Sequence, residues 1–308
     1  MRSMLAFRQA LRAERRLARS EHGVSGLWTA AGAGLFAGGV AVGVTLAIER
    51  WGGVRGGLLG TVPTTIVPAS LGFQAQATTP EALRQALWAV PVGMLANALF
   101  LFAWRAIPPR LPPWSLGRRL VAVLGLSLLG WGLAAGAMVL GLRALRADGV
   151  SLLWPGLLAA ALLLLGGAWA STAPVKAPRG RRPVGPLTLC LRGSLAAGAI
   201  AAAVLVQGAG GEVLAGMLAV FPAIFLTAMV GLWLSQGEAV PAGAVGPMLL
   251  GSSSVAAYAH LAAWSQPALG PVAGAALAWA GAVGGVTLPA GLWLQRRAAA
   301  AGGSGQGS

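Results

Sequence analysis

Long apolar runs, separated by short polar or basic stretches, dominate this sequence. Nine runs are recognisable, near 26–48, 57–75, 85–107, 119–142, 150–172, 187–207, 213–235, 240–264 and 268–294. Because an α-helix rises about 1.5 Å per residue, about 20 apolar residues cross the hydrocarbon core of a bilayer. Only 9% of the residues are charged, which is too few to cover a water-soluble surface. We therefore predict an all-α, polytopic transmembrane helix bundle.

The charge balance of the chain is strongly basic, with 22 Lys and Arg residues against seven acidic residues. Most of the basic residues flank the apolar runs, where such residues orient membrane spans, so we expect no nucleic-acid partner. Residues 1–25 hold six Arg between regularly spaced apolar residues, a pattern typical of an amphipathic helix on an anionic leaflet. We expect this segment to lie in the cytoplasm and to contact anionic lipids, and the protein to be a multi-pass protein of a bacterial inner membrane.

Residues that perform redox, metal or catalytic chemistry are scarce in this sequence. Cys190 is the one cysteine, which excludes an intrachain disulfide, and the two histidines are far apart. The sequence has no nucleophile or phosphate-binding motif and no pair of carboxylates within one segment. We therefore predict no catalytic site, no metal site and no cofactor, and an enzyme is the third of our three functional hypotheses.

Two blocks of the sequence resemble each other. They are GGVRGGLLGTVPTTIVPASLGF at 52–73 and GGEVLAGMLAVFPAIFLTAMVGL at 210–232. Aligning Pro63 with Pro222 also pairs Gly72 with Gly231, as an internal duplication would. We predict two four-segment repeats, at 26–142 and 187–294. A linker helix at 150–172 lies between them, and a flexible tail follows at 295–308.

A short motif in the second repeat carries a family resemblance. Residues 215–222 read Ala-Gly-Met-Leu-Ala-Val-Phe-Pro, which resembles the Ala-Gly-Leu…Phe-Pro block in the second segment of small GlpM-type bacterial inner-membrane proteins. The resemblance covers about 187–294, and 26–142 follows it more loosely, with Val62-Pro63 in place of Phe-Pro. It implies a four-segment membrane architecture for each repeat. It implies no catalytic residue, because the family has no well-established activity.

Prolines interrupt the second segment of each repeat. Pro63 and Pro68 lie within 57–75, and Pro222 lies within 213–235. A proline removes a backbone donor and clashes with the preceding turn, and broken backbone at membrane depth requires protein or water to satisfy it. We therefore predict a helix that is broken or re-entrant in each segment, with the three prolines as hinges.

Charge counting separates two topologies. If all nine segments span with the N-terminus inside, nine Lys and Arg residues lie inside and thirteen outside. If 57–75 enters and returns, the count becomes seventeen inside and five outside, which the positive-inside tendency favours. That topology places the N-terminus, 105–119 and 174–186 on one face. In the alternative, an odd linker helix inverts the second repeat, which is a common transporter plan.

Polar side chains near the prolines are the candidates for a solute or ion site. The residues that we expect to bind a substrate are Thr64, Thr65, Ser70, Asn97, Ser252, Ser253 and Ser254. The alternative is that they satisfy their own helix or bond neighbouring helices. For gating or proton relay the candidates are Glu49, Glu212 and His260, which could equally be solvated or interfacial. We expect Arg192 to extend from its span toward the basic loop at 176–182.

The duplication and the broken segments favour a transporter or channel-like carrier of a small solute or ion, with its site at the repeat interface. The alternative function is a non-catalytic membrane assembly or regulatory subunit. Glycine pairs four residues apart suit close helix packing, within the chain or in a homo-oligomer or membrane complex. These pairs are Gly34/Gly38, Gly39/Gly43, Gly132/Gly136 and Gly281/Gly285.

Overall fold

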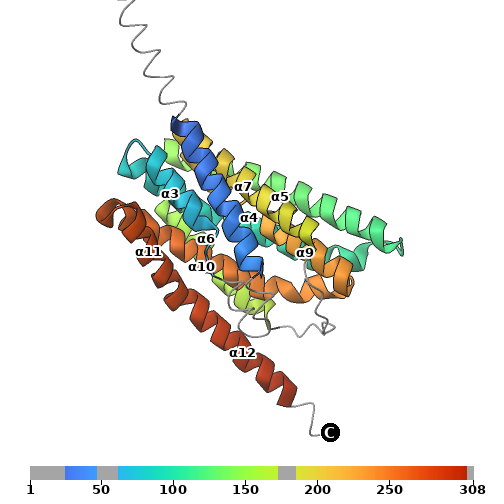
Figure 1. The fold of residues 1–308 in the computed structure, drawn as a ribbon. Coiled ribbons are helices and arrows are strands. Elements are labelled where there is room, and N and C mark those ends of the chain that lie inside the picture. The colour runs from blue at the N-terminus through green and yellow to red at the C-terminus, as the bar shows by residue number, and fades with distance from the viewer. Residues whose placement is uncertain (1–24, 47–61, 173–184, 304–308) are drawn as a thin grey trace, which may run out of the picture.

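The computed structural model describes residues 25–46, 62–172 and 185–303, and this part of the chain is helical, with no β-strand. Eight of its helical stretches are long and apolar enough to cross a membrane, so the protein is an all-α, multi-pass membrane protein (Figure 1). The candidate spans are a first helix at Ser25–Leu46, α4 at Pro80–Ala106, α5 at Leu116–Ala147, α6 at Leu153–Ala170, α7 at Pro186–Gly208, α8 with α9 at Glu212–Leu218 and Ala223–Gln236, α10 at Ala239–Leu269, and α11 with α12 at Pro271–Ala282 and Leu288–Gly303.

The expected segment 57–75 contributes no candidate span within the described residues. It appears there as α3, Ile66–Gln76, whose eleven residues are about 16 Å long and reach only about halfway through a bilayer. At the other end of the chain, a π-helical stretch at Val283–Thr287 joins α11 to α12. The helix α12 continues to Gly303, past position 294, where we expected the last span to end and a flexible tail to begin.

Side-chain contacts define the direction of each helix. The amide of Gln76, at the end of α3, donates to the Gly26 carbonyl at 3.1 Å and lies against Gly208 at the end of α7. These positions share one membrane face, which we call face 1. The helix α5 begins where Arg119 pairs with Glu238, on the opposite face, which we call face 2.

At its other end α5 returns to face 1, where Arg146 pairs with Glu212 at 2.5 Å. The first helix and α4 therefore run from face 1 to face 2, whereas α3 and α5 run back. In the second half, α7 and α10 run from face 2 to face 1, whereas α8–α9 and α11–α12 run back. Each element of the first half is thus antiparallel to its counterpart in the second.

This arrangement corrects the topology favoured by charge counting. Ser25 lies on face 1 and the turn at 107–115 lies on face 2, at opposite ends of the first helix and of α4. The prediction that the N-terminal end and 105–119 share a face is therefore wrong. The first helix ends at Leu46 on face 2, whereas α3 ends at Gln76 on face 1. A re-entrant 57–75 would instead end on face 2. Residues 1–24 and 173–184 lie outside the described part.

Non-helical backbone occurs beside two of the three prolines expected to be hinges. Residues 62–65 are not helical, and α3 begins only at Ile66. The helix α8 ends at Leu218, and α9 begins at Ala223 with Pro222 as its N-cap. In contrast, Pro68 lies in the first turn of α3, where a backbone N–H has no partner within the helix, so this proline breaks nothing.

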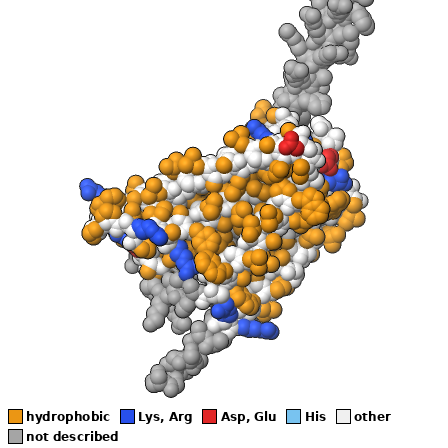
Figure 2. Space-filling view, turned by 180° about the vertical axis from the view of Figure 1, so that it is seen from behind, with side chains coloured by type: hydrophobic (Ala, Val, Ile, Leu, Met, Phe, Trp, Pro, Cys, Tyr) orange, Lys and Arg blue, Asp and Glu red, His pale blue; other side chains and the backbone are white. Residues whose placement is uncertain are grey.

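The centre of the bundle is formed by α4 and α10, while α6 packs across both of them. Trp104 of α4 and Trp233 of α9 are fully buried and meet edge to face. Viewed from behind, the molecule presents hydrophobic side chains over its middle, with charged side chains gathered toward opposite ends (Figure 2). This is the surface that a lipid bilayer requires.

Close glycine packing joins the two halves of the chain. A Cβ added at Gly34 would lie 2.7 Å from the Ala197 carbonyl oxygen, and one at Gly38 would lie 2.9 Å from the Gly193 carbonyl oxygen. The first helix and α7 thus touch backbone to backbone, as small residues permit in lipid. Of the other expected pairs, only Gly281 meets another helix, through Leu261. The rest have open space where a Cβ would be: Gly39, Gly43, Gly132, Gly136 and Gly285.

Candidate functional site

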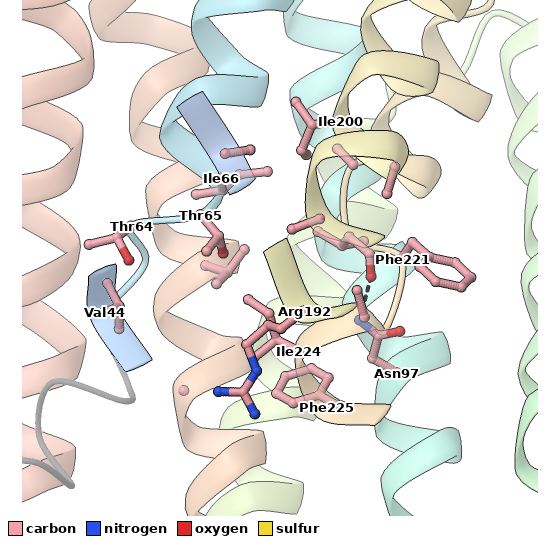
Figure 3. Close-up of a pocket in the computed structure, with 18 of the residues that line it drawn as sticks. Val44, Thr64, Thr65, Ile66, Asn97, Arg192, Ile200, Phe221, Ile224 and Phe225 are labelled. Atoms are coloured by element: carbon pink, nitrogen blue, oxygen red, sulfur yellow. Dashed lines mark hydrogen bonds between the residues drawn. The ribbon is translucent and has the colours of Figure 1, made fainter. Parts of the chain in front are cut away.

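An internal cavity of about 150 Å³ lies where the two broken segments meet (Figure 3). Its walls come from both halves of the chain: the first helix, residues 62–66 and α4 on one side, and α7, residues 219–225 and α10 on the other. Because α3 and α9 both begin partway across the bundle, the cavity lies at membrane depth and not at either face.

Two helix N-termini border the cavity. Ile66 is the first residue of α3 and Ala223 is the first residue of α9, and both line the cavity. Their N-caps, Thr65 and Pro222, make no side-chain capping hydrogen bond. The N-terminus of a helix carries a partial positive charge from its free N–H groups. The two broken helices therefore direct positive potential toward the same space from opposite directions.

Arg192 of α7 adds a full positive charge to the cavity wall. Its side chain is 8% exposed, and its Nε and Nη1 donate to the hydroxyls of Thr227 at 2.9 Å and Thr45 at 2.7 Å. The basic loop at 176–182, toward which we expected this side chain to extend, lies outside the described residues; within them, the guanidinium is held between α9 and the first helix. A charged residue inside an apolar span was the sequence signal for a functional position.

Asn97 of α4 fastens the break in α8–α9 to its neighbours. Its Nδ2 donates to the Val220 carbonyl at 2.7 Å, and its Oδ1 accepts from Trp131 Nε1 of α5 at 2.8 Å. The indole of Trp131 also meets the Phe221 ring edge to face, with centroids 5.2 Å apart. Asn97 therefore lines the cavity but uses its amide to position the broken backbone.

Thr64 and Thr65 also line the cavity, so three of the seven predicted substrate-binding residues come together there, with Asn97 as the third. Ser70 does not reach it. Its buried hydroxyl lies 2.5 Å from that of Tyr258 and accepts from Gln266 Nε2 at 2.9 Å, which ties α3 to α10.

The three consecutive serines of α10 do not line the cavity either. Ser252 and Ser253 donate to carbonyls of their own helix, and Ser254 shares a hydrogen bond of 2.7 Å with Thr287. Other residues of α10 take their place in the wall: Met248, Gly251 and Val255. The structure therefore does not bring the serines together with Thr64, Thr65 and Asn97.

The residues expected to gate or to relay protons lie elsewhere. Glu212 begins α8 at face 1, where it pairs with Arg146. His260 of α10 packs against Gly156 of α6. Neither residue lines the cavity, and Glu49 lies outside the described residues.

Among the described residues, no three His, Cys, Asp or Glu side chains are grouped closely enough to hold a metal ion, and Cys190 is exposed. The cavity wall offers a guanidinium, hydroxyls, helix N-termini and apolar side chains, which suit the binding of a polar group. Comparison with protein-family models, curated proteins and solved structures gave no match to this chain.

Proposed function

We propose that this protein is a membrane carrier that binds a small solute or ion in the cavity between its two broken segments. The observation that carries the proposal is the meeting of two helix N-termini and Arg192 at one cavity at membrane depth. Discontinuous helices in transporters place their N-termini against anionic substrate groups near the midplane. An ionised residue inside a membrane span is by default a functional position.

The relation between the two halves supports this proposal. Gly34 and Gly193, Gly38 and Ala197, and the two hinge prolines are each 159 residues apart in the sequence (193 − 34, 197 − 38 and 222 − 63). The close contacts of Gly34 with Ala197 and of Gly38 with Gly193 are therefore one contact repeated about a two-fold axis. We infer an inverted duplication of 26–142 and 187–294, with α6 as the linker, and we retain the GlpM-like character of each unit as part of this proposal.

An inverted duplication offers a simple transport cycle. Two units of similar fold and opposite direction can exchange conformations, so a state open to face 1 has an equivalent state open to face 2. The cavity lies between the units and keeps its lining residues in both states. Rocking of one unit against the other then exposes the bound solute to each face in turn.

Flux through the purified protein in liposomes tests the proposal. The probes are radiolabelled inorganic phosphate and acetate, and phosphatidic acid with a fluorescent acyl chain. We expect at least one probe to move, and Thr65→Val to lower its flux with an unchanged melting temperature, because Thr65 lines the cavity. Ser253→Ala is the matched control, since that hydroxyl bonds only its own helix among the described contacts. No flux of any probe, or equal flux in both variants, contradicts a carrier.

The exposed face of α5 favours a second function, a subunit of a membrane assembly. Only 17% of the apolar stretch of this helix is buried, and several of its glycines have open space where a Cβ would be: Gly125, Gly130, Gly132, Gly136 and Gly141. Another helix could approach such a surface closely. Gly136→Leu should then reduce the mass of the detergent-solubilised particle, and a monomeric wild type would exclude this function.

The cellular setting remains a proposal. We place the protein in a bacterial inner membrane with face 1 toward the cytoplasm. Six Arg precede the first span on that side, and basic residues beside the first span usually dominate orientation. The same Arg cluster would contact anionic lipids of the cytoplasmic leaflet.

A further inference from the structure

A second hollow opens sideways from the bundle toward the lipid. It is a groove of about 610 Å³ between the first helix and α11, with α3 as its floor. Its walls are almost entirely apolar and include Phe36, Leu71, Ala276 and Trp279. Phe36 is 50% exposed and Trp279 is 37% exposed, so the groove faces the hydrocarbon of the bilayer.

The groove and the cavity share two wall residues. Val44 of the first helix and Thr64, just before α3, line both hollows. In Figure 3 these two residues lie together at one edge of the cavity, away from Phe221 and Asn97. The two spaces are therefore neighbours, and a ligand that passes between Val44 and Thr64 would occupy both.

The two hollows differ in chemistry. Among the described residues that line the cavity, Arg192 is the one with a formal charge, and it lies beside the N-termini of α3 and α9. Of the described residues in the groove wall, Thr64 and Trp279, through its indole, have polar side chains, and the others are apolar or glycine. A ligand that complements both spaces has an anionic end and an apolar chain. A water-soluble anion would leave the groove unused.

The size of the cavity narrows the choice of head group. A space of about 150 Å³ holds roughly one benzene-sized molecule. A phosphate monoester or a carboxylate fits such a space, whereas a sugar head group does not. The acyl chain would remain in hydrocarbon throughout, so binding would require dehydration of the head group alone.

We propose, on the basis of the carrier function above, that the substrate is a membrane lipid with a small anionic head group, such as phosphatidic acid. The head group enters the cavity from the side, between Val44 and Thr64, and is held by Arg192 and the two helix N-termini. The acyl chain lies in the groove between the first helix and α11. Transport then moves the head group between the leaflets while the chain stays in the bilayer.

The test measures movement of lipids with fluorescent acyl chains between the leaflets of liposomes that contain the full-length protein. We expect phosphatidic acid to move about tenfold faster than phosphatidylcholine, since one charge-assisted hydrogen bond is worth at least that factor. Ala276→Phe fills the groove and should abolish the movement. Ala280→Phe makes the same change on an exposed part of α11 outside the groove and should leave it unchanged.

Arg192 provides the second arm of the test. Arg192→Gln should remove the preference for phosphatidic acid, and Arg192→Lys should keep a larger share of it because the charge remains. If Arg192→Gln does not fold, as judged by size exclusion, the comparison of Ala276→Phe with Ala280→Phe still decides. Equal rates for the two lipids, or equal rates for the two phenylalanine variants, would overturn the proposal.

The same liposomes, loaded with radiolabelled inorganic phosphate, separate this inference from the carrier function. If phosphate moves in a manner that depends on Thr65 while neither lipid moves, the lipid substrate is refuted and the carrier function stands. If neither phosphate, acetate nor lipid moves, both are refuted. If phosphatidic acid moves and Ala276→Phe stops it, both are supported.

Discussion

Replacement of Asn97 by leucine should destabilise the bundle by removing the link between α4, α5 and the break in α8–α9. Asn97 is 1% exposed and makes two short hydrogen bonds, to the Val220 carbonyl and from Trp131 Nε1. Leucine has the same branched side chain of four heavy atoms, although its methyl groups are bulkier than the amide, so Asn97→Leu leaves no cavity while both partners lose their bond. The Val220 carbonyl lies in the break between α8 and α9, where no continuous helix provides a backbone N–H for it.

The expected magnitude follows from the two bonds. Each interhelical hydrogen bond in a membrane protein contributes about 0.6 kcal/mol on average and at most about 1.7 kcal/mol. A buried group left unpaired adds a penalty, and truncation of one partner costs about 1–3 kcal/mol. For two bonds we expect a loss of about 2–4 kcal/mol, which lowers the melting temperature by about 5–10 °C in a chain of this size.

A double-mutant cycle with Trp131→Phe isolates one of the two bonds. We expect Trp131→Phe alone to cost about 1 kcal/mol, and the double variant to cost less than the sum of the single variants by about 0.6–1.7 kcal/mol. The assay is reversible unfolding of the purified protein in mixed micelles, supported by thermal melts. Ser127→Ala is the control, because that buried hydroxyl of α5 bonds only Leu124 of its own helix among the described contacts.

If the losses in unfolding free energy of the two single variants add up to that of the double variant, the assigned bond between Asn97 and Trp131 is refuted. A melting temperature for Asn97→Leu equal to that of Ser127→Ala would refute the larger argument, that Asn97 fastens the broken backbone.

Two further predictions concern packing and topology. Gly216→Ala should lower the melting temperature, because its Cβ would lie 2.1 Å from a carbonyl oxygen of α4, whereas Gly231→Ala, where a Cβ meets open space, should be neutral. Overpacking of this kind costs about 1–3 kcal/mol, and equal melting temperatures for the two variants would contradict the contact. In a Cys190→Ser background, cysteines at Ser25 and Ser115 should be labelled by an impermeant maleimide from opposite sides of the membrane; labelling of both from one side would contradict the opposite faces assigned to them.

Part of the cavity wall was predictable from the sequence, because the prolines that interrupt an apolar run are visible there. Thr64 and Thr65 lie beside Pro63 in the non-helical stretch before α3, and this stretch and the first residue of α3 line the cavity. The serines of α10 failed to follow because a serine hydroxyl can donate to a carbonyl one turn back in its own helix. Such a residue does not need to face a partner or a cavity.

The sequence by itself determined that the chain is an all-α membrane protein and where most of its spans lie, because the cost of unpaired backbone in lipid acts locally on every apolar run. It also marked Pro63 and Pro222 as positions of non-helical backbone. Only the tertiary structure decided that α3 ends on the face opposite to the end of the first helix, that Arg192 is buried, and that residues 62–66 and 219–225 share one cavity. Those outcomes depend on how the helices pack side by side. Because lipid is apolar, it does not favour one rotation or one neighbour of an apolar helix over another. Close contacts, such as those of Gly34 and Gly38, set the rotation and the pairing instead.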